Sequence, residues 1–319
     1  MNIEKALSAP EENISAFVVQ KDGRTVYEYY KDGCRGDSPF HVFSVTKSVV
    51  GLLLGIAIDE KLVGGVDCRV LDFFPGYVPK RGEKTLQRVA LRDMLAMTAP
   101  FKYKSAPYTK HFTSMDWVKS SLDLLGGKGE IGEFRYTPVI GPDIFTGILR
   151  SATGMTPLDF AQARLFGPLG IDVPGNIDFK SKEEQFAFYK SRSMRGWVAD
   201  PSGNNTGGWG LVLTPNDMVK IGRLALDRGM FGGKRVVSEK WIDESTAVHS
   251  RWKEIGAKFG YLWWVIDEGE RAFAALGDGG NAIYVNRSKG LVVAAASYFK
   301  PKMYDRVRLI REVVEPAFG

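Results

Sequence analysis

One apolar segment constrains the fold of this chain more than any other part. From Ser44 onward the sequence reads SVTKSVVGLLLGIAIDEKLV, which has the length of a helix and is apolar on nearly every side. A helix with this pattern is buried among other elements instead of lying on a surface. The chain has 319 residues, 44% of them hydrophobic, so it can enclose such a helix in a large core. We therefore predict a central helix that begins at Ser44.

Strand-like runs occupy both ends of the chain. ISAFVVQ and TVYEYY flank an Asp-Gly pair and predict a hairpin, because Asp-Gly favours a tight two-residue turn. Near the other end, turn-forming residues separate YLWWVID, RAFAALG, AIYVN and LVVAAASY, and the tail MYDRVRLIREVVEPAF has the spacing of an amphipathic helix. We expect an α+β fold with a central antiparallel sheet of about five strands flanked by helices.

The middle of the chain has a different character. Residues 64–204 contain short helical patterns such as LRDMLAM and PLDFAQARLF, separated by glycine and proline. After them, TPNDMVKIGRLAL has a capping threonine, a first-turn proline and helical spacing. We expect residues 1–63 and 205–319 to form the sheet region and residues 64–204 a mainly helical insertion. The functional site is expected between these two regions, within one unit.

Ser44 and Lys47 stand one helical turn apart at the start of the apolar segment. On a helix the two side chains share a face, so the amine can accept the hydroxyl proton while the oxygen attacks a carbonyl. The lysine must then be uncharged, which a water-poor pocket promotes. The alternative roles are a helix N-cap for the serine and a solvated first-turn position for the lysine.

The same S-x-x-K spacing occurs twice more, and its context separates the three cases. Ser250 and Lys253 lie in a charged stretch with no apolar helix behind them. Ser297 ends a strand-like run, and a proline follows Lys300, so no helix holds that lysine one turn away. Only the tetrad at Ser44 begins a buried helix, whose positive end favours a developing oxyanion.

Five blocks of sequence, in order, resemble serine β-lactamases, penicillin-binding carboxypeptidases and their esterase relatives. The blocks are HVFSVTKSVVGLLLGIAIDEKLV, LRDMLAMTAP, GEFRYTPVIGPDIFTGILRSATGMTPLDFAQARLFGPLGI, GGWGLVLTPNDMVKIGRLALDRGMFGGKRVVSEKWIDEST, and GYLWWVID followed by ALGDGGNAIYV. The resemblance covers nearly the whole chain and includes the class C β-lactamase-related and nylon-oligomer hydrolases. It implies a β-lactamase/transpeptidase-like fold and an acyl-enzyme formed on Ser44.

The resemblance also assigns a second motif, Tyr-x-Asn in the family, to Tyr136, Thr137 and Pro138. It implies that Tyr136 exchanges a proton with Lys47 and passes it to the leaving group. Without the resemblance, Tyr136 would be interpreted as an ordinary half-buried tyrosine before a proline turn. The missing asparagine puts in doubt the contact that usually holds a substrate amide side chain.

The family's third motif, Lys-Thr-Gly or His-x-Gly, corresponds to Asp278, Gly279 and Gly280. The glycines suit a strand that a substrate approaches closely. Asp278 would repel a substrate carboxylate, or it is only a turn residue. By resemblance, the backbone N–H groups of Ser44 and Asn281 form the oxyanion hole. Trp209 lines the substrate pocket or belongs to the aromatic core, as do Trp263 and Trp264.

Other motifs carry less weight. The glycines at 127, 129 and 132 match a dinucleotide pattern but precede EFRYTP, which is no helix, so we interpret them as a loop. The histidines His41, His111 and His249 have no metal-ligand spacing, and we expect no metal and no cofactor. His41, three residues before the serine, lines the site or serves the structure. A net charge of +6 without a basic block argues against a nucleic-acid site.

The location of the protein is predicted from what the chain contains. Its start, MNIEKALSAPEENISAF, has no apolar core of a signal peptide, although a removed leader would look the same. The longest apolar run is too short to cross a bilayer, and two cysteines suit a reducing compartment. We expect a cytoplasmic protein with no membrane partner; its oligomeric state is open.

The sequence therefore predicts a serine acyl-hydrolase of the esterase or amidase type that acts on a small ester or amide, with Ser44, Lys47 and Tyr136 as its reacting groups. Two alternatives remain open at this stage. One is a non-catalytic binding or scaffold protein with the same fold, which the changed residues Pro138 and Asp278 would suit. The other is a penicillin-recognising β-lactamase or D-Ala carboxypeptidase.

Overall fold

An antiparallel sheet of eight strands forms the centre of the computed structural model, which describes residues 3–9, 13–300 and 306–319. The strand order is β2-β1-β14-β13-β12-β11-β10-β9, so the N-terminal hairpin pairs with the last strand of the chain. The bounds are β1 Ala16–Lys21, β2 Arg24–Tyr30, β9 Ser250–Trp252, β10 Ala257–Phe259, β11 Trp264–Asp267, β12 Ala272–Gly277, β13 Asn281–Asn286 and β14 Leu291–Ala296.

The predicted hairpin at the start of the chain is confirmed. Asp22 and Gly23 connect β1 to β2 with φ angles of +48° and +79°. Two successive positive φ angles give the turn whose twist matches that of the flanking strands, and glycine accepts such an angle without strain. The Asp-Gly pair thus fixes the register of the sheet's edge.

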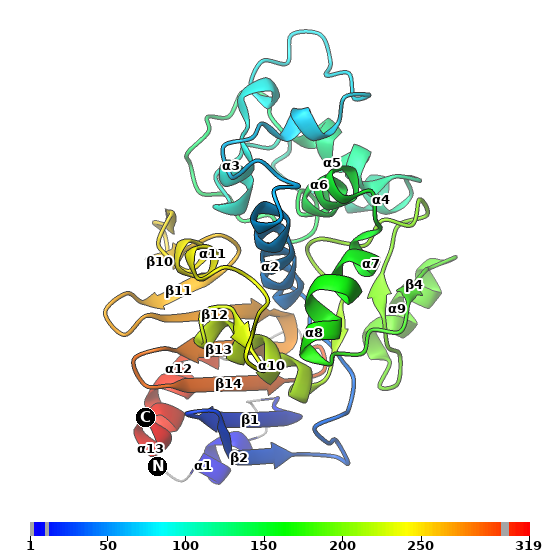
Figure 1. Cartoon of the computed structure of the whole chain (residues 1–319). Coiled ribbons are helices and arrows are strands. Elements are labelled where there is room, and N and C mark those ends of the chain that lie inside the picture. The colour runs from blue at the N-terminus through cyan, green and yellow to red at the C-terminus, as the bar shows by residue number, and fades with distance from the viewer. Residues whose placement is uncertain (1–2, 10–12, 301–305) are drawn as a thin grey trace.

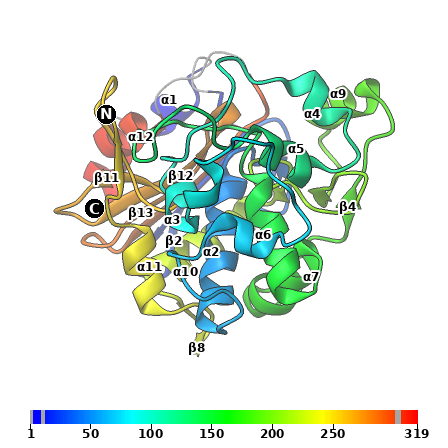
Figure 2. The same ribbon diagram turned by 90° about the horizontal axis from the view of Figure 1, so that it is seen from above.

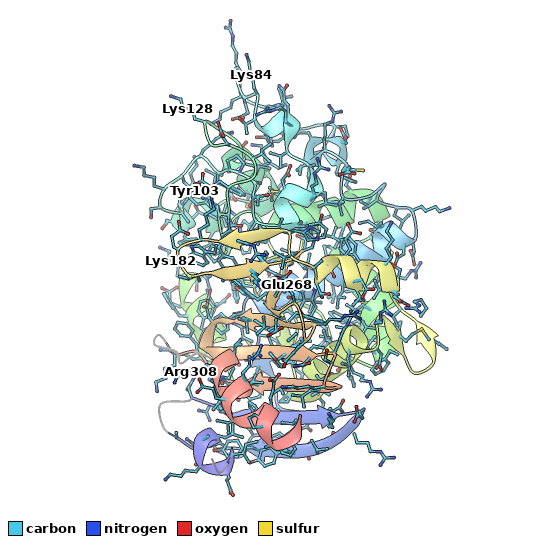
Figure 3. The ribbon with its side chains drawn as sticks, turned by 90° about the vertical axis from the view of Figure 1, so that its left-hand side faces the viewer. Lys84, Tyr103, Lys128, Lys182, Glu268 and Arg308 are labelled. Carbon is cyan, nitrogen blue, oxygen red and sulfur yellow. The ribbon has the colours of Figure 1, made fainter. Side chains whose placement is uncertain are left out.

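Helices cover both faces of the sheet (Figure 1). On one face, α1 (Ile3–Leu7) and a C-terminal helical segment pack against Phe17 and Tyr284. That segment comprises α12 Arg306–Leu309, a π-helical turn at Ile310–Val314 and α13 Glu315–Phe318. The amphipathic tail helix is confirmed over these residues, while 303–305 of the predicted stretch lie outside the described residues. Figure 3 views this face from the side, with Arg308 on the C-terminal helix and with Lys84 and Lys128 at the far end.

The helix predicted at Ser44 is α2 (Val45–Asp59), which covers the opposite face of the sheet. Every residue from Val45 to Ala57 is buried, which agrees with the apolar character of the segment. Seen from above, α2 lies at the centre of the molecule (Figure 2). Around it are α3 (Leu91–Leu95), α6 (Asp143–Thr153), α10 (Pro215–Leu226) and α11 (Glu239–Ser245). Removing its apolar surface from water is the main force that fixes its position.

Further helices and short strands surround α2, and one of these helices, α10, also packs against β13 and β14 of the sheet. Their bounds are β3 Phe40–His41, α3 Leu91–Leu95, α4 Tyr108–Phe112, α5 Trp117–Leu124, α6 Asp143–Thr153, α7 Pro157–Ala161, α8 Gly167–Leu169, β4 Asn176–Ile177, α9 Lys182–Lys190, β5 Trp197–Val198 and β6 Val212–Leu213. They continue with α10 Pro215–Leu226, β7 Met230–Phe231, β8 Lys234–Arg235 and α11 Glu239–Ser245. Short 3-10 turns lie at Val70–Phe73 and Leu86–Arg88, and a π-helical turn lies at Gln162–Phe166. One hydrophobic cluster includes residues from α2, α6 and β14, so the sheet region and the helical region share a core.

The expected count of about five strands was too low, because the sheet has eight. The added strands β9 and β10 are only three residues long and carry partly exposed, charged residues such as Arg251 and Lys258. Such short strands have no clear hydrophobic alternation and depend on pairing, β10 with β11 and β9 with β10. In YLWWVID, regular strand begins only at Trp264, because Leu262 has a φ angle of +62°.

Candidate active site

The side chains of Ser44 and Lys47 meet at the N-terminal end of α2. Lys47 Nζ lies 2.9 Å from Ser44 Oγ. Phe43, the residue before the serine, has a φ angle of +48°, which is uncommon without glycine and turns the chain sharply from β3 into the helix. Ser44 is partly exposed, whereas Lys47 is only 2% exposed. The hydroxyl is thus reachable from outside while the amine is enclosed.

Two backbone carbonyls hold the Lys47 amine from the side opposite the helix. Nζ donates to the oxygen of Pro138 over 2.8 Å and to the oxygen of Gly208 over 3.0 Å. A neutral amine has two N–H groups and one lone pair. If the carbonyls receive the two N–H groups, the lone pair is directed at Ser44 Oγ and can accept its proton.

The environment of Lys47 favours the uncharged amine. Burial lowers the pKa of Lys47 to about 7, although the carboxylates of Asp278 and Asp143 oppose this change. A substantial fraction of Lys47 is therefore a free base at neutral pH. The ring of Tyr136 lies beside it, with its centroid 5.1 Å from Nζ.

Tyr136 contacts the same serine from the other side. Burial raises the pKa of Tyr136 to about 12, while a hydrogen bond with Ser44 acts in the opposite direction. The phenol is therefore protonated at neutral pH and can act as a proton donor. The two groups have separate roles, since Lys47 can accept a proton and Tyr136 can supply one.

Ser44 opens into a cavity of about 690 Å³. Most of its wall is apolar or aromatic, and its charged members are Lys190, Arg192 and Asp278; the other lining residues are Phe43, Pro138, Val139, Phe186, Tyr189, Trp209, Tyr298 and Phe299. A cavity of this size suits a small organic molecule. The predicted pocket residues Trp209 and Asp278 thus share one cavity with the serine.

The turn after β12 places Asp278 at this cavity but directs its neighbours elsewhere. Gly279 and Gly280 have φ angles of +78° and +85° and form the turn to β13; they do not line the cavity. The side chain of Asn281 is 1% exposed, donating to the Asp278 and Ser297 carbonyls. Gly277 is the close neighbour of the serine, because a Cβ there would lie 3.2 Å from Ser44 N and overlap the carbonyl oxygen of Val42.

His41 and Trp209 belong to an aromatic cluster behind the cavity. Burial lowers the pKa of His41 to about 3, and its Nε2 accepts the Gly210 N–H over 2.9 Å. Its ring lies 5.8 Å from that of Trp209 and 3.9 Å from that of Phe43, measured between centroids. His41 therefore supports the wall of the site as a neutral ring. Trp263 is fully buried in the core.

The other sequence candidates lie elsewhere. Ser250 is in β9, where its hydroxyl donates to the Ala96 carbonyl, and Ser297 follows β14, so neither begins a helix. The glycine-rich stretch from 127 to 132 is irregular, as predicted. Within residues 3–9, 13–300 and 306–319, no group of three or more acidic, histidine or cysteine side chains has the arrangement of a metal site. His249 stacks on Tyr261.

Sequence analysis missed several contributors to the site. The carbonyls of Pro138 and Gly208 are backbone groups, which no residue pattern reveals. Asp143, the first residue of α6, is 1% exposed and acts electrostatically on Lys47. In the sequence it is one acidic residue at the start of a helix, and no pattern connects it with Lys47. Phe186 of α9 also lines the cavity, and it was not expected there because it belongs to none of the motifs in the sequence.

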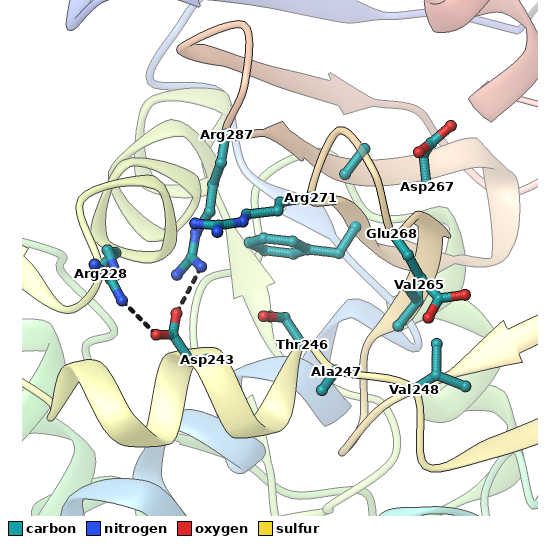
Figure 4. Close-up of a pocket in the computed structure, with 12 residues that line it drawn as sticks. Arg228, Asp243, Thr246, Ala247, Val248, Val265, Asp267, Glu268, Arg271 and Arg287 are labelled. Atoms are coloured by element: carbon teal, nitrogen blue, oxygen red, sulfur yellow. Dashed lines mark hydrogen bonds and ion pairs between the residues drawn. The ribbon is translucent and has the colours of Figure 1, made fainter.

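A separate cavity of about 380 Å³ lies beside α11 and the start of β12 (Figure 4). Asp243 forms ion pairs there with Arg228 and with Arg287, over 2.5 Å and 2.7 Å. Its lining contains no serine, cysteine or lysine. Neither Ser44 nor Lys47 lines this cavity, so it is separate from the site described above.

An S-x-x-K serine at the tip of a core helix, against an antiparallel sheet, defines the class of β-lactamase-like serine hydrolases. The chain belongs to the Beta-lactamase family, whose profile matches residues 12–315. This finding agrees with the resemblance seen in the sequence.

The relatives of the chain include enzymes with different substrates. It is 25% identical over 252 residues to the 6-aminohexanoate-dimer hydrolase of Paenarthrobacter ureafaciens; the match covers 74% of this chain and 58% of that protein. The chain thus spans less than two thirds of that relative. A penicillin-binding protein homologue from Caulobacter crescentus superposes with a TM-score of 0.74 at 18% identity, covering 97% of this chain and 94% of the other. A family VIII carboxylesterase gives 0.72 at 19%, covering 98% and 96%.

The match to the whole length of these structures confirms the β-lactamase/transpeptidase-like fold. Because the sequence identities are only 18% and 19%, these two structures establish the fold and do not identify the substrate. No helix of the described residues has the length and apolar character needed to span a membrane. Cys34 and Cys68 are both free thiols.

Proposed function

We propose that the protein is a serine acyl-hydrolase that cleaves a small ester or amide through an acyl-enzyme on Ser44. The observation that carries this proposal is the buried amine of Lys47, 2.9 Å from a serine hydroxyl that faces a cavity. A lysine whose pKa lies at about 7 is suited to general-base catalysis at neutral pH.

In the first step, Ser44 Oγ attacks the substrate carbonyl carbon and its proton moves to Lys47 Nζ. A tetrahedral intermediate forms, with negative charge on the former carbonyl oxygen. Tyr136 then donates its proton to the departing alcohol or amine, the bond to the leaving group breaks, and Lys47 returns a proton to Tyr136. The products of this step are the free leaving group and an ester on Ser44.

In the second step, water replaces the leaving group. Lys47 accepts a proton from the water as the water oxygen attacks the acyl carbon. The bond to Ser44 Oγ then breaks as Lys47 passes this proton to Oγ. The acid is released and the enzyme returns to its first state. The reacting groups that the protein supplies in the two steps are Ser44, Lys47 and Tyr136.

The backbone N–H of Ser44 is the first donor to the oxyanion in this mechanism. Among the residues that the structure describes, no backbone carbonyl accepts a hydrogen bond from it, and it lies at the positive end of α2. The turn after β12 supplies the second donor. Asn281 was the expectation from the sequence; the close approach of Gly277 to Ser44 and the position of Asp278 on the cavity wall favour the Asp278 N–H instead.

The cavity favours substrates with an apolar acyl or alcohol part. Its walls are mainly aromatic and aliphatic, and Asp278 places a carboxylate close to the reacting serine. A neutral group, or an amine, fits the part of the cavity beside Asp278 better than a carboxylate does, whereas Lys190 and Arg192 of the same wall can accept an acidic group elsewhere in the cavity. The carboxylesterase and the 6-aminohexanoate-dimer hydrolase among its relatives are consistent with ester or amide cleavage.

Covalent labelling tests the proposal directly. The protein should react with a fluorophosphonate, gain the corresponding mass at Ser44, and hydrolyse p-nitrophenyl butyrate. Ser44→Ala should lose both properties. Ser250→Ala, which removes the serine of another S-x-x-K tetrad outside the cavity, is the matched control and should retain them.

The same experiment addresses the two alternatives. A folded protein that neither labels nor hydrolyses any ester would be a binding or scaffold member of the family, and the proposal would be wrong. Stable labelling by a fluorescent penicillin at Ser44, faster than labelling by esters, would instead identify a penicillin-recognising protein.

A further inference from the structure

A buried chain of hydrogen bonds connects His111 to the segment that holds the Lys47 amine. His111 Nε2 lies 3.1 Å from Asp143 Oδ2, and its Nδ1 lies 3.1 Å from Ser120 Oγ. The other oxygen of Asp143 accepts the N–H of Gly207 over 2.9 Å. The next residue, Gly208, offers its carbonyl oxygen to Lys47 Nζ over 3.0 Å.

The central members of this hydrogen-bonded series, His111 and Asp143, are enclosed in protein. His111 is 0% exposed and Asp143 is 1% exposed, and Ser120 is partly buried. They come from three helices, namely α4, α5 and α6. Neither His111 nor Asp143 lines the cavity at Ser44, so they do not touch a substrate there. A serine, histidine and aspartate in series are therefore not a second catalytic triad in this protein.

The segment from Gly207 to Gly208 is pressed against the loop before α6. A Cβ at Gly207 would overlap the carbonyl oxygen of Pro142, and a Cβ at Gly208 would lie 2.7 Å from the oxygen of Pro138. The two carbonyl groups that accept hydrogen bonds from Lys47 thus belong to two backbone segments in direct contact. Asp143, the first residue of α6 directly after this loop, connects the same two backbone segments because its carboxylate accepts the N–H of Gly207.

We propose that Asp143, held by His111, is a positioning residue that sets both the location and the proton affinity of the Lys47 amine. It acts on location through Gly207 and Gly208. It acts on proton affinity through its charge, which stands in a dry environment and is therefore poorly screened. This inference rests on the proposed function, because it concerns the base of that reaction.

Four groups in contact with or near Lys47 determine its titration. Ser44 and Tyr136 are its uncharged neighbours, and the carboxylates are Asp143 from α6 and Asp278 from the turn after β12. Both carboxylates favour the charged amine, but Asp278 is exposed whereas Asp143 is buried. Salt should therefore weaken the effect of Asp278 and leave that of Asp143.

Asp143→Asn removes the negative charge at this position and keeps the hydrogen-bond geometry. The amide oxygen can still accept the Gly207 N–H, and the amide nitrogen can meet the other tautomer of His111. We expect Lys47 in this variant to titrate about one pH unit lower than in the unaltered protein. The shift should persist at about 0.5 M NaCl, where the screening length is only a few ångströms. The corresponding shift in Asp278→Asn should largely disappear in salt.

The measurement should follow the amine itself as well as the activity. Protein labelled with ¹³C at lysine Cε gives a titrating signal for Lys47, which Lys47→Arg identifies by its loss. The acid limb of kcat/KM for p-nitrophenyl butyrate should move with this signal. If the protein proved to have no hydrolase activity, the titration of the amine would still test the inference separately from the proposed function.

Asp172→Asn is the matched control, because it removes one exposed carboxylate elsewhere in the helical region and should leave the titration unchanged. If Asp143→Asn does not fold, His111→Phe provides a second test. A buried carboxylate that loses this hydrogen bond is protonated more readily, so part of the charge of Asp143 is lost and the titration of Lys47 should shift in the same direction; His111→Gln should restore part of it. An unchanged midpoint in a folded Asp143→Asn or His111→Phe protein would overturn the proposal.

Discussion

The carbonyl oxygen of Pro138 accepts a hydrogen bond from Lys47 Nζ over 2.8 Å. Pro138 occupies the position where the second family motif has asparagine, and the contact to the lysine needs only backbone. The substitution is therefore compatible with a working base. What it removes is the amide side chain that would have faced a substrate.

The pH dependence of hydrolysis should follow the protonation of Lys47. Its pKa is lowered to about 7, and only the uncharged amine can accept the Ser44 proton. We expect kcat/KM to fall about tenfold per pH unit below this value and to level off above it. Steady-state kinetics with p-nitrophenyl butyrate from pH 5 to 9 measures this directly. Lys47→Arg should be inactive throughout, since arginine keeps its proton; activity independent of pH would contradict the assignment.

Tyr136→Phe should affect substrates according to their leaving group. An alkoxide or amine anion needs a proton to depart, whereas p-nitrophenolate does not. We expect a loss of about 10²–10⁴ in kcat for an alkyl ester or an amide, and a much smaller loss for a p-nitrophenyl ester. Tyr298→Phe, in the wall of the same cavity, is the control. Equal losses for both substrate types would mean that Tyr136 does not serve as the donor.

Asp278→Lys should reverse the charge preference of the cavity. The carboxylate of Asp278 lines the cavity beside Ser44 and repels an anionic substrate. We expect the ratio of kcat/KM for an ammonium-bearing ester to that for a carboxylate-bearing ester to fall by about tenfold or more, which corresponds to about 1.4 kcal/mol. Paired succinyl and aminoacyl esters at low salt provide the measurement. Unchanged turnover of the carboxylate-bearing ester would contradict a role for Asp278 in selection.

Phe186 should contribute to the binding of longer acyl chains. It lines the cavity, yet its side chain is 64% exposed, so a bound chain can cover it. Covering an aromatic side chain stabilises a complex by about 1.5–3 kcal/mol. Phe186→Ala should therefore lower kcat/KM for p-nitrophenyl octanoate by about tenfold or more and change that for the butyrate little. Val78→Ala, which removes an apolar side chain that is 85% exposed, should affect neither ester.

Much of the fold followed from local patterns. The apolar segment after Ser44 predicted a core helix, Asp22 and Gly23 predicted a hairpin, and Thr214 with Pro215 predicted the start of α10, where the structure has a capping box. These features are decided by neighbouring residues. The strands β9 and β10 were missed because their residues become strands only by pairing, β10 with β11 and β9 with β10.

The site was predictable only in part, for a related reason. The spacing of Ser44 and Lys47 on one helix fixes their contact, so the sequence alone determined that a hydroxyl and an amine would meet. Family resemblance added Tyr136 and the turn at Asp278. The sequence could not determine the charge state of the amine, because that depends on burial and on carboxylates far away in the chain. Only the tertiary structure encloses Lys47, brings the carbonyls of Pro138 and Gly208 to it, and places Asp143 behind them. The position of backbone groups and the burial of a side chain cannot be read from residue types, because they depend on how distant segments pack in the folded protein.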